Sequence, residues 1–169
     1  MNKKINIALV GFGNIGSYFY KTVQANNKNI TIKTGKIPFI KYICAKSLNK
    51  NRKVKIPKTK WIKNPISLTK KKDVDIIVEL IGGSDGIAKK LIFNALQNKK
   101  HVITANKALI SKHGDKLAIL AEKNKVNLEY EASVAAGVPI IRSIKEGLIA
   151  NKIIKICGIL NGTTNYILS

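Results

Sequence analysis

The stretch INIALVGFGNIGSYFYKTV, residues 5–23, decides the fold. Its apolar run, Ile5–Val10, is short and ends at a glycine, which predicts a buried β-strand. Ile15, Phe19 and Val23 then recur at a spacing of four, which predicts a helix directly after it. A strand, a glycine turn and a helix in this order indicate the first unit of a parallel α/β fold.

The turn between these two elements is a GxGxxG motif. Gly11 allows the tight turn, Gly13 lets the backbone approach a pyrophosphate, and Gly16 lets the helix pack closely on the strand. The helix N-terminus adds free N–H groups and a positive dipole. We expect the whole turn to bind a dinucleotide, and the alternative is a tight turn without a ligand. The candidate residues are Gly11, Phe12, Gly13, Asn14, Ile15 and Gly16.

Apolar runs and helical periodicity alternate along the rest of the chain. Further strands are expected at residues 39–45, 73–80, 101–104, 126–130 and 153–160. Helices are expected around residues 88–96 and 117–121, and from Pro139 through Gly147. The lysine-rich residues 46–72 are expected to form an exposed connection with little regular structure. The pattern predicts an α/β, Rossmann-type, doubly wound and mostly parallel sheet.

The chain is strongly basic and its charge is uneven. It has 169 residues and a formal net charge of +22, and residues 1–72 carry 18 Lys and Arg but no acid. Such a surface attracts phosphates, so a nucleic-acid-binding role is one hypothesis. However, only Arg52 and Arg142 are arginines and aromatic residues make up 6%. Specific base readers rely on both types, so we expect solvated lysines and no specific nucleic-acid partner.

The cysteines and the hydropathy indicate the compartment. Cys44 and Cys157 are too far apart to match a metal or redox motif, and we expect reduced, mostly buried thiols. No apolar run is long enough for a membrane helix. The start of the chain breaks into glycines instead of reaching a signal cleavage site. We therefore expect a cytoplasmic protein.

The end of the second strand indicates which dinucleotide binds. NAD-binding domains place an acid there for the ribose hydroxyls, and no acid precedes Asp73. Lys46 stands at that place, and its ammonium suits the 2′-phosphate of NADP. We expect NADP, with NAD possible. The alternative is that Lys46 is one surface lysine among many.

Lys107 follows the expected strand at residues 101–104. Ligands of open α/β sheets bind at the carboxyl ends of the strands, so Lys107 is expected beside the nicotinamide. A lysine held there would lose part of its hydration and could take part in proton transfer.

Five motifs together resemble homoserine dehydrogenase, and they cover nearly the whole chain in order. They are GFGNIG at 11–16, VELIGG at 78–83, VITANKALIS at 102–111, YEASVAAGVPII at 130–141 and GILNGTTNYIL at 158–168. The resemblance implies NAD(P)-dependent interconversion of L-homoserine and L-aspartate 4-semialdehyde. This reaction lies on the route to threonine, isoleucine and methionine.

The resemblance also implies residue roles. Lys107 matches a lysine that contacts substrate and nicotinamide and takes part in proton transfer, and Thr163 matches a residue near the substrate. A monovalent-cation site, with sodium as the expected ion, is implied at Glu131, Val134, Ala136 and Val138.

The same resemblance implies a domain division. Residues 1–150 would form the NAD(P)-binding domain, and 151–169 would begin a substrate and dimerisation domain. The family continues beyond this motif and its full-length members are expected to be homo-oligomers, so the chain looks truncated. A non-catalytic NADP-binding module, alone or completed by a partner, is the alternative.

Overall fold

The fold is built on one parallel sheet. A computed structural model describes residues 3–47, 54, 56–135 and 137–158. Within these residues five strands lie in the order β2-β1-β3-β4-β5, and every pair is parallel. The strands are β1 (Lys3–Val10), β2 (Lys36–Cys44), β3 (Ile76–Glu79), β4 (His101–Thr104) and β5 (Leu128–Glu129). This confirms the predicted parallel α/β architecture.

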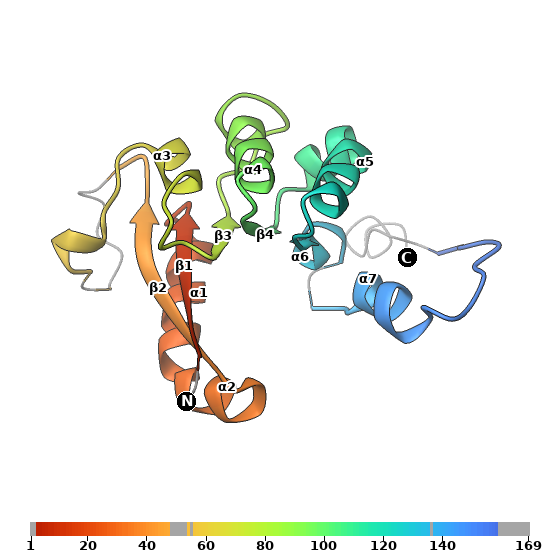
Figure 1. Cartoon of the computed structure of the whole chain (residues 1–169), viewed down its shortest axis with the longest axis horizontal. Helices are drawn as coiled ribbons and strands as arrows, with labels where there is room; N and C mark the ends of the chain where they lie inside the picture. Colours follow the sequence, from red (N-terminus) through yellow and green to blue (C-terminus); the bar gives the residue numbers. More distant parts are fainter. Residues whose placement is uncertain (1–2, 48–53, 55, 136, 159–169) are drawn as a thin grey trace, which may run out of the picture.

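Helices cover the two faces of the sheet unequally. On one face, α1 (Asn14–Ala25) packs through Val23 beside Ile7 and Leu9 of β1. On the other face lie α3 (Pro65–Thr69), α4 (Ile87–Gln97) and α5 (Lys107–Lys123). Figure 1 shows these three helices in a row along the sheet. Because the helices after β1 and after β3 lie on opposite faces, the sheet is doubly wound.

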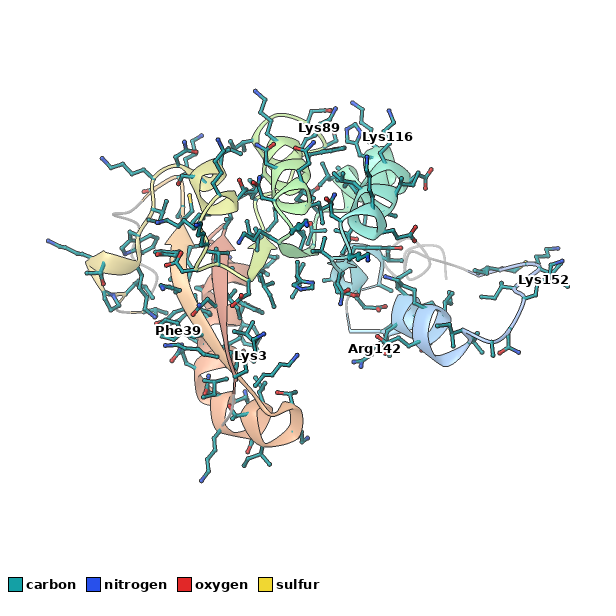
Figure 2. All side chains as sticks on the ribbon, viewed as in Figure 1. Lys3, Phe39, Lys89, Lys116, Arg142 and Lys152 are labelled. Carbon is teal, nitrogen blue, oxygen red and sulfur yellow. The ribbon has the colours of Figure 1, made fainter. Side chains whose placement is uncertain are left out.

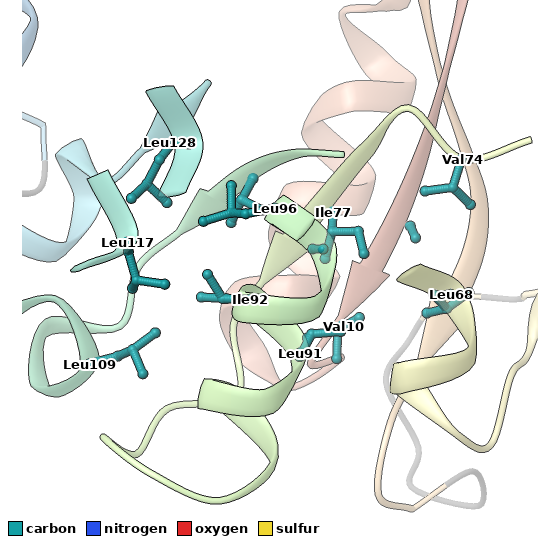
Figure 3. Packing of buried hydrophobic residues seen from close by; sticks show 14 of the residues in the cluster. Val10, Leu68, Val74, Ile77, Leu91, Ile92, Leu96, Leu109, Leu117 and Leu128 are labelled. Carbon is teal, nitrogen blue, oxygen red and sulfur yellow. The ribbon is translucent and has the colours of Figure 1, made fainter. Parts of the chain in front are cut away.

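The main core lies between the sheet and α3, α4 and α5. The alternation of side chains along β1 sends Ala8 and Val10 into it, and Ile77 of β3 lies beside them. α4 contributes the apolar stripe at the i, i+3, i+4 spacing that its sequence predicts. Figure 3 shows the fully buried residues that fill this space: Leu68, Ile77, Leu91, Ile92, Leu96, Leu109 and Leu117.

The order of the strands indicates where a ligand would bind. The chain passes from β1 outward to β2 and then returns to β3 on the other side of β1. Two connections therefore diverge at the carboxyl ends of β1 and β3. Open α/β sheets bind their ligands at such a point. The glycine turn follows β1 there, directly beside the loop that follows β3.

Residues 46–72 are more structured than the sequence predicts. The described part contains a 3₁₀ turn, η1 (Lys58–Lys60), and the helix α3. Leu68 and Thr69 are fully buried, and Asn64 caps α3 by accepting a hydrogen bond from the Ile66 N–H. The prediction of an exposed connection is wrong for this part, because a few apolar residues among the lysines suffice to dock it on the core. Residues 48–53 and 55 lie outside the described residues.

Three other elements differ from expectation. A second helix, α2 (Asn27–Thr34), follows α1, although it has no buried residue and no apolar stripe. β5 has only two residues, because the chain turns at Tyr130 into the short helix α6 (Glu131–Val134). No strand forms at residues 153–158, where Ile154 is 92% exposed; residues 159 and 160 lie outside the described residues.

The C-terminal part runs away from the sheet. Pro139 precedes α7 (Ile140–Arg142) and a π-helical turn, η2 (Ser143–Gly147), where a helix is predicted. Cys44 is buried but Cys157 is exposed, so the expectation of buried thiols holds only for Cys44; both are free. Among the described residues, none of the helices combines the length and the apolar character that crossing a membrane requires.

Candidate functional site at the carboxyl edge of the sheet

The candidate site lies where four parallel strands end. β1, β2, β3 and β4 end at Val10, Cys44, Glu79 and Thr104. Their pairing continues one step beyond the strands, since the Gly11 N–H donates to the Cys44 carbonyl and the Leu80 N–H donates to the Val10 carbonyl. The loops that follow therefore start from fixed positions. They bring together the glycine turn, Lys46, Ile81–Gly86 and Lys107.

The three glycines of the motif meet three different surroundings. Gly11 has φ of +101°, and a Cβ there would lie 2.5 Å from the Leu80 carbonyl oxygen. A Cβ at Gly16 would lie 2.0 Å from the Gly11 carbonyl oxygen, so helix and turn touch at this point. A Cβ at Gly13 would meet no atom of the described residues within 4 Å. Gly11 and Gly16 thus shape the turn, whereas Gly13 leaves space beside it.

The start of α1 is suited to an anion. Its N-cap is Gly13, no side chain caps the helix, and no acid stands in its first turn. The first N–H groups of a helix have no partner within the helix, so a phosphate could accept hydrogen bonds from them. The open space beside Gly13 and the free N–H groups of α1 lie together. They fit the pyrophosphate of a dinucleotide.

The other residues of the turn divide between surface and core. Ile15 is 66% exposed and lines a cavity of about 190 Å³ with Ile81, Gly82 and Asn106. Asn14 is exposed. Phe12 is buried and packs edge-on against the rings of Tyr20 and Trp61. Its side chain supports the turn from behind, so any contact of Phe12 with a cofactor would come from its backbone.

Lys46 lines a second cavity at the same edge of the sheet. This cavity has about 380 Å³ and is walled by Val10, Ala45, Ile81, Gly82 and Ile87. Lys63 also lines it, which the sequence analysis did not predict. Trp61 pairs with Ile43 as in a parallel ladder, and the Ile62 N–H donates to the Ile43 carbonyl, so this segment follows β2 to its end. Lys63 therefore joins the predicted Lys46 in lining this cavity.

Glu79 is a second residue that the sequence analysis missed. It ends β3 and is fully buried. Its Oε1 accepts hydrogen bonds from the N–H groups of Ile81 and Gly82, at 2.8 and 3.0 Å, and its Oε2 accepts one from the Thr104 hydroxyl at 2.6 Å. The carboxylate therefore fixes the loop after β3 to β4. The sequence did contain a signal for this role, since Glu79 is an acidic residue at the end of the apolar run of β3.

Asn106 sets the start of α5 and therefore the place of Lys107. Asn106 caps the helix, with its Oδ1 accepting from the Leu109 N–H, while its Nδ2 donates to the Gly83 carbonyl at 2.8 Å. Lys107 is the first residue of α5 and directly follows Asn106, which lines the cavity of Ile15. The Lys107 side chain is exposed, so the described residues do not give it the dehydrated environment that was expected.

Glu131 lies after β5, farther along the same edge. Its Oε1 accepts a hydrogen bond from the Ile141 N–H at 2.8 Å, and its Oε2 accepts one from the Arg142 N–H at 2.9 Å. Val134 ends α6 and Val138 is 57% exposed. Ala136 and Thr163, which were also predicted as site residues, lie outside the described residues. Among the described residues there is no group of three or more His, Cys, Asp or Glu that could hold a metal ion.

Comparison with known proteins agrees with this geometry. Residues 11–131 match the family described as "Homoserine dehydrogenase, NAD binding domain", and residues 139–169 match the family "Homoserine dehydrogenase". The homoserine dehydrogenases of Neisseria gonorrhoeae and Bacillus subtilis are 42% and 39% identical to the chain over 99% of its length. The chain spans 38% of the length of each of these two relatives.

Solved structures give the same result. The homoserine dehydrogenase of Thiobacillus denitrificans superposes with a TM-score of 0.87 at 36% identity, over 99% of this chain and 38% of its own. A hyperthermophilic archaeal homoserine dehydrogenase solved with NADPH shares the fold, with a TM-score of 0.72 at 22% identity. The parallel sheet, the glycine turn and the match over residues 11–131 lead to one conclusion: this chain belongs to the homoserine dehydrogenase family and carries its NAD-binding domain.

Proposed function

We propose that the chain is the NADP(H)-binding part of an enzyme that interconverts L-homoserine and L-aspartate 4-semialdehyde. One observation carries this proposal: the glycine turn, Lys46 and Lys107 follow three different strands and meet at one edge of the sheet. This edge offers donors for a pyrophosphate, cations for a further phosphate and an ammonium for proton transfer. The family of the chain supports the substrate pair.

Some residues of the chain would bind the cofactor, and Lys107 would take part in proton transfer. When bound, the nicotinamide ring supplies or accepts the hydride. The N–H groups at the start of α1 would hold the phosphates. Ile81 and Gly82, in the loop after β3, line both cavities and would contact the cofactor between them. Lys107 would donate a proton to the oxygen of the semialdehyde, or accept it from homoserine in the reverse direction.

NADP is the proposed cofactor in preference to NAD. Lys46 and Lys63 line the cavity beside the end of β2, where NAD-binding domains place an acid. Among the described residues, neither Asp nor Glu lines this cavity, so no described carboxylate there would repel a 2′-phosphate.

We also propose a binding site for a monovalent cation, with sodium as the expected ion. The Glu131 carboxylate and the carbonyls of Val134, Ala136 and Val138 are hard oxygen donors, which sodium prefers. Each carboxylate oxygen of Glu131 already accepts one N–H, and each has a further lone pair for a cation. Glu131 would hold the ion and the first turn of α7 together.

We further propose that residues 1–150 form the nucleotide-binding domain and that 151–169 belong to the substrate domain. The whole enzyme would be a cytoplasmic homo-oligomer, active in the synthesis of threonine, isoleucine and methionine. Thr163 is assigned to the substrate. We disfavour a specific nucleic-acid partner, because arginines and aromatic residues are few. The four lysines labelled in Figure 2, Lys3, Lys89, Lys116 and Lys152, lie at widely separated places on the molecule.

A chimera tests this function. The chain is joined to the part of the Neisseria gonorrhoeae homoserine dehydrogenase that lies beyond the matched region, and homoserine-dependent reduction of NADP is measured. We expect turnover by the chimera. Lys107→Ala should lower kcat by about 10²- to 10⁴-fold, the range of general acid–base catalysis, while NADPH binding is largely retained.

Lys116→Ala is the matched control. Lys116 is also an exposed lysine of α5, about two and a half turns from its start, and Figure 2 labels it. Its removal takes away the same charge and should leave kcat within about twofold. A folded chimera that binds NADPH but gives no homoserine-dependent reduction would contradict the proposed activity. Equal turnover of the Lys107→Ala and Lys116→Ala chimeras would contradict the role of Lys107.

A further inference from the structure

The loop that follows β3 forms a wall shared by both cavities of the site. Ile81 and Gly82 line the cavity of Lys46 as well as the cavity of Ile15 and Asn106. Gly82 and Gly83 have φ of +76° and +87°. Glycines lose the most conformational freedom on folding, so this wall needs contacts from other elements to keep one conformation.

Two buried side chains hold this wall directly. The Glu79 carboxylate accepts hydrogen bonds from the N–H groups of Ile81 and Gly82 through Oε1. The Asn106 side chain donates to the Gly83 carbonyl at 2.8 Å, and Asn106 itself lines the cavity of Ile15. The residues that shape the cavities are therefore held from the end of β3 and from the start of α5.

The Thr104 hydroxyl joins these two holding residues. It donates to Oε2 of Glu79 at 2.6 Å and accepts from the Asn106 N–H at 3.0 Å. Because the Asn106 N–H can only donate, the Thr104 oxygen accepts from it and the hydroxyl proton is directed to Glu79. These contacts close a ring of hydrogen bonds that runs through Glu79, Ile81–Gly83, Asn106 and Thr104.

The side chains of this ring are shielded from water. Glu79, Thr104 and Asn106 are 0%, 1% and 5% exposed. If the hydroxyl were removed, Oε2 of Glu79 and the N–H of Asn106 would each lose a partner that water does not readily replace. Both groups would then shift toward new partners, and the cavity wall that they hold would shift with them.

We propose that Thr104 is a positioning residue of the cofactor site, whose hydroxyl closes the ring and so sets the places of Ile81, Gly82 and Asn106. The inference rests on the proposed function, because it takes the two cavities as the cofactor site. Thr104 lines neither cavity and acts through residues that do.

Variants of β4 test the role of the hydroxyl by titration of the 169-residue chain with NADPH. Thr104→Val keeps the shape of the side chain without the hydroxyl and should weaken NADPH binding at least about fivefold, since buried polar groups lose their partners. Thr104→Ser keeps the hydroxyl and should restore the affinity to within about twofold of the natural chain.

Val102→Ala is the matched control for lost stability. Val102 lies two residues earlier on the same strand, is fully buried in the main core and lines neither cavity of the site. Val102→Ala should lower the melting temperature but change NADPH affinity by less than about twofold, because the ring stays intact.

A double-mutant cycle tests whether Thr104 acts through Glu79. In Glu79→Gln, the amide oxygen can still accept from Ile81 and Gly82, but the amide nitrogen cannot accept from the Thr104 hydroxyl. This variant should also weaken NADPH binding. Thr104→Val combined with Glu79→Gln should weaken it by less than the product of the two single effects, because both break the same contact.

Several results would overturn the inference. Natural NADPH affinity in Thr104→Val, or in Glu79→Gln where Thr104→Val does not fold, would show that the ring does not set the site. Equal weakening by Thr104→Val and Val102→Ala would show a merely structural role, and multiplying effects in the cycle would show that Thr104 does not act through Glu79. If the unmodified chain does not bind NADPH, the proposed function fails as well. If it binds and only the Thr104 effects are missing, the proposed function stands and this inference is wrong.

Discussion

At the scale of single residues, two glycines of the turn have different roles: Gly16 is needed for the fold, and Gly13 for cofactor binding. Gly16 has no room for a side chain, because the Gly11 carbonyl lies where its Cβ would be. Gly13 has open space around its Cα and no unusual backbone angle. The same substitution at these two positions should therefore have opposite consequences.

We predict that Gly16→Ala lowers the free energy of unfolding by at least about 1–3 kcal/mol, the usual cost of overpacking. Gly13→Ala should leave stability nearly unchanged but weaken NADPH binding, because the new methyl group occupies the space for the pyrophosphate. Denaturant unfolding and NADPH titration of both variants check this. Gly13→Ala with unchanged NADPH affinity would show that the pyrophosphate does not bind at this turn.

Asp73 gives a prediction on pH. Its carboxylate accepts a 2.8 Å ion-pair contact from the Lys41 ammonium and a 2.7 Å hydrogen bond from the Tyr42 hydroxyl. Lys41 first, and Tyr42 second, lower the pKa of Asp73 to about 2. An unfolded aspartate has a pKa of about 3.9. The folded state thus holds the proton of Asp73 less tightly than the unfolded state does, so ionised Asp73 stabilises the fold. This stabilisation is complete above about pH 4 and is lost as the pH falls through about 2.

The Asp73→Asn variant isolates this effect. The difference in unfolding free energy between the natural chain and the variant should be constant from pH 6 to about pH 4.5 and shrink toward pH 2. Denaturant unfolding at several pH values measures it, and the comparison cancels the general acid sensitivity of a chain with net charge +22. A difference that does not change with pH would contradict the assigned cause.

The residues of the site were predictable where a motif names them. The glycine turn, Lys46 and Lys107 lie at the predicted edge of the sheet because strand ends and helix starts follow from local patterns. Lys63 and Glu79 were not predicted, because their places in the site depend on residues distant in the sequence, such as Thr104, which donates to the Glu79 carboxylate. Lys63 reaches the site only because Trp61 pairs with Ile43, and no local pattern contains that pairing.

At the scale of elements, strands with a continuous apolar run and helices with an apolar stripe were predicted well. β4 has the predicted bounds, and α4 buries the predicted stripe. α2 was missed because it lies on the surface without a buried side and is held by local bonds, such as that from the Asn27 side chain to the Pro38 carbonyl. The missing strand at residues 153–158 shows that an apolar run forms a strand only where another strand pairs with it.

The short helix α3 is the element whose importance is easiest to test. Leu68 is fully buried in the main core, although it comes from a lysine-rich segment. We predict that Leu68→Ala lowers the free energy of unfolding by about 2–5 kcal/mol, the range for truncating a buried leucine. Lys70→Ala, at the exposed end of the same helix, should change it by less than about 0.5 kcal/mol. A cost below about 1 kcal/mol for Leu68→Ala would show that α3 is not part of the core.

At the scale of the whole molecule, the doubly wound sheet brings every predicted cofactor contact to one edge. The glycine turn, the cavity of Lys46 and Lys63, and the loop fixed by Glu79 all belong to residues 3–107. They are held by the core between the sheet and α3, α4 and α5. Cofactor binding should therefore be a property of the 169-residue chain itself, whereas turnover should require residues from the remaining length of the relatives.

Titration of the 169-residue chain with NADPH and NADH, by calorimetry or by nicotinamide fluorescence, tests the central claim most directly. We predict that NADPH binds about tenfold more tightly than NADH, because a charge-assisted contact to the 2′-phosphate is present only with NADPH. Lys46→Ala should remove most of this difference and leave NADH binding unchanged. The absence of binding by either cofactor would contradict the claim that this edge of the sheet is a dinucleotide site.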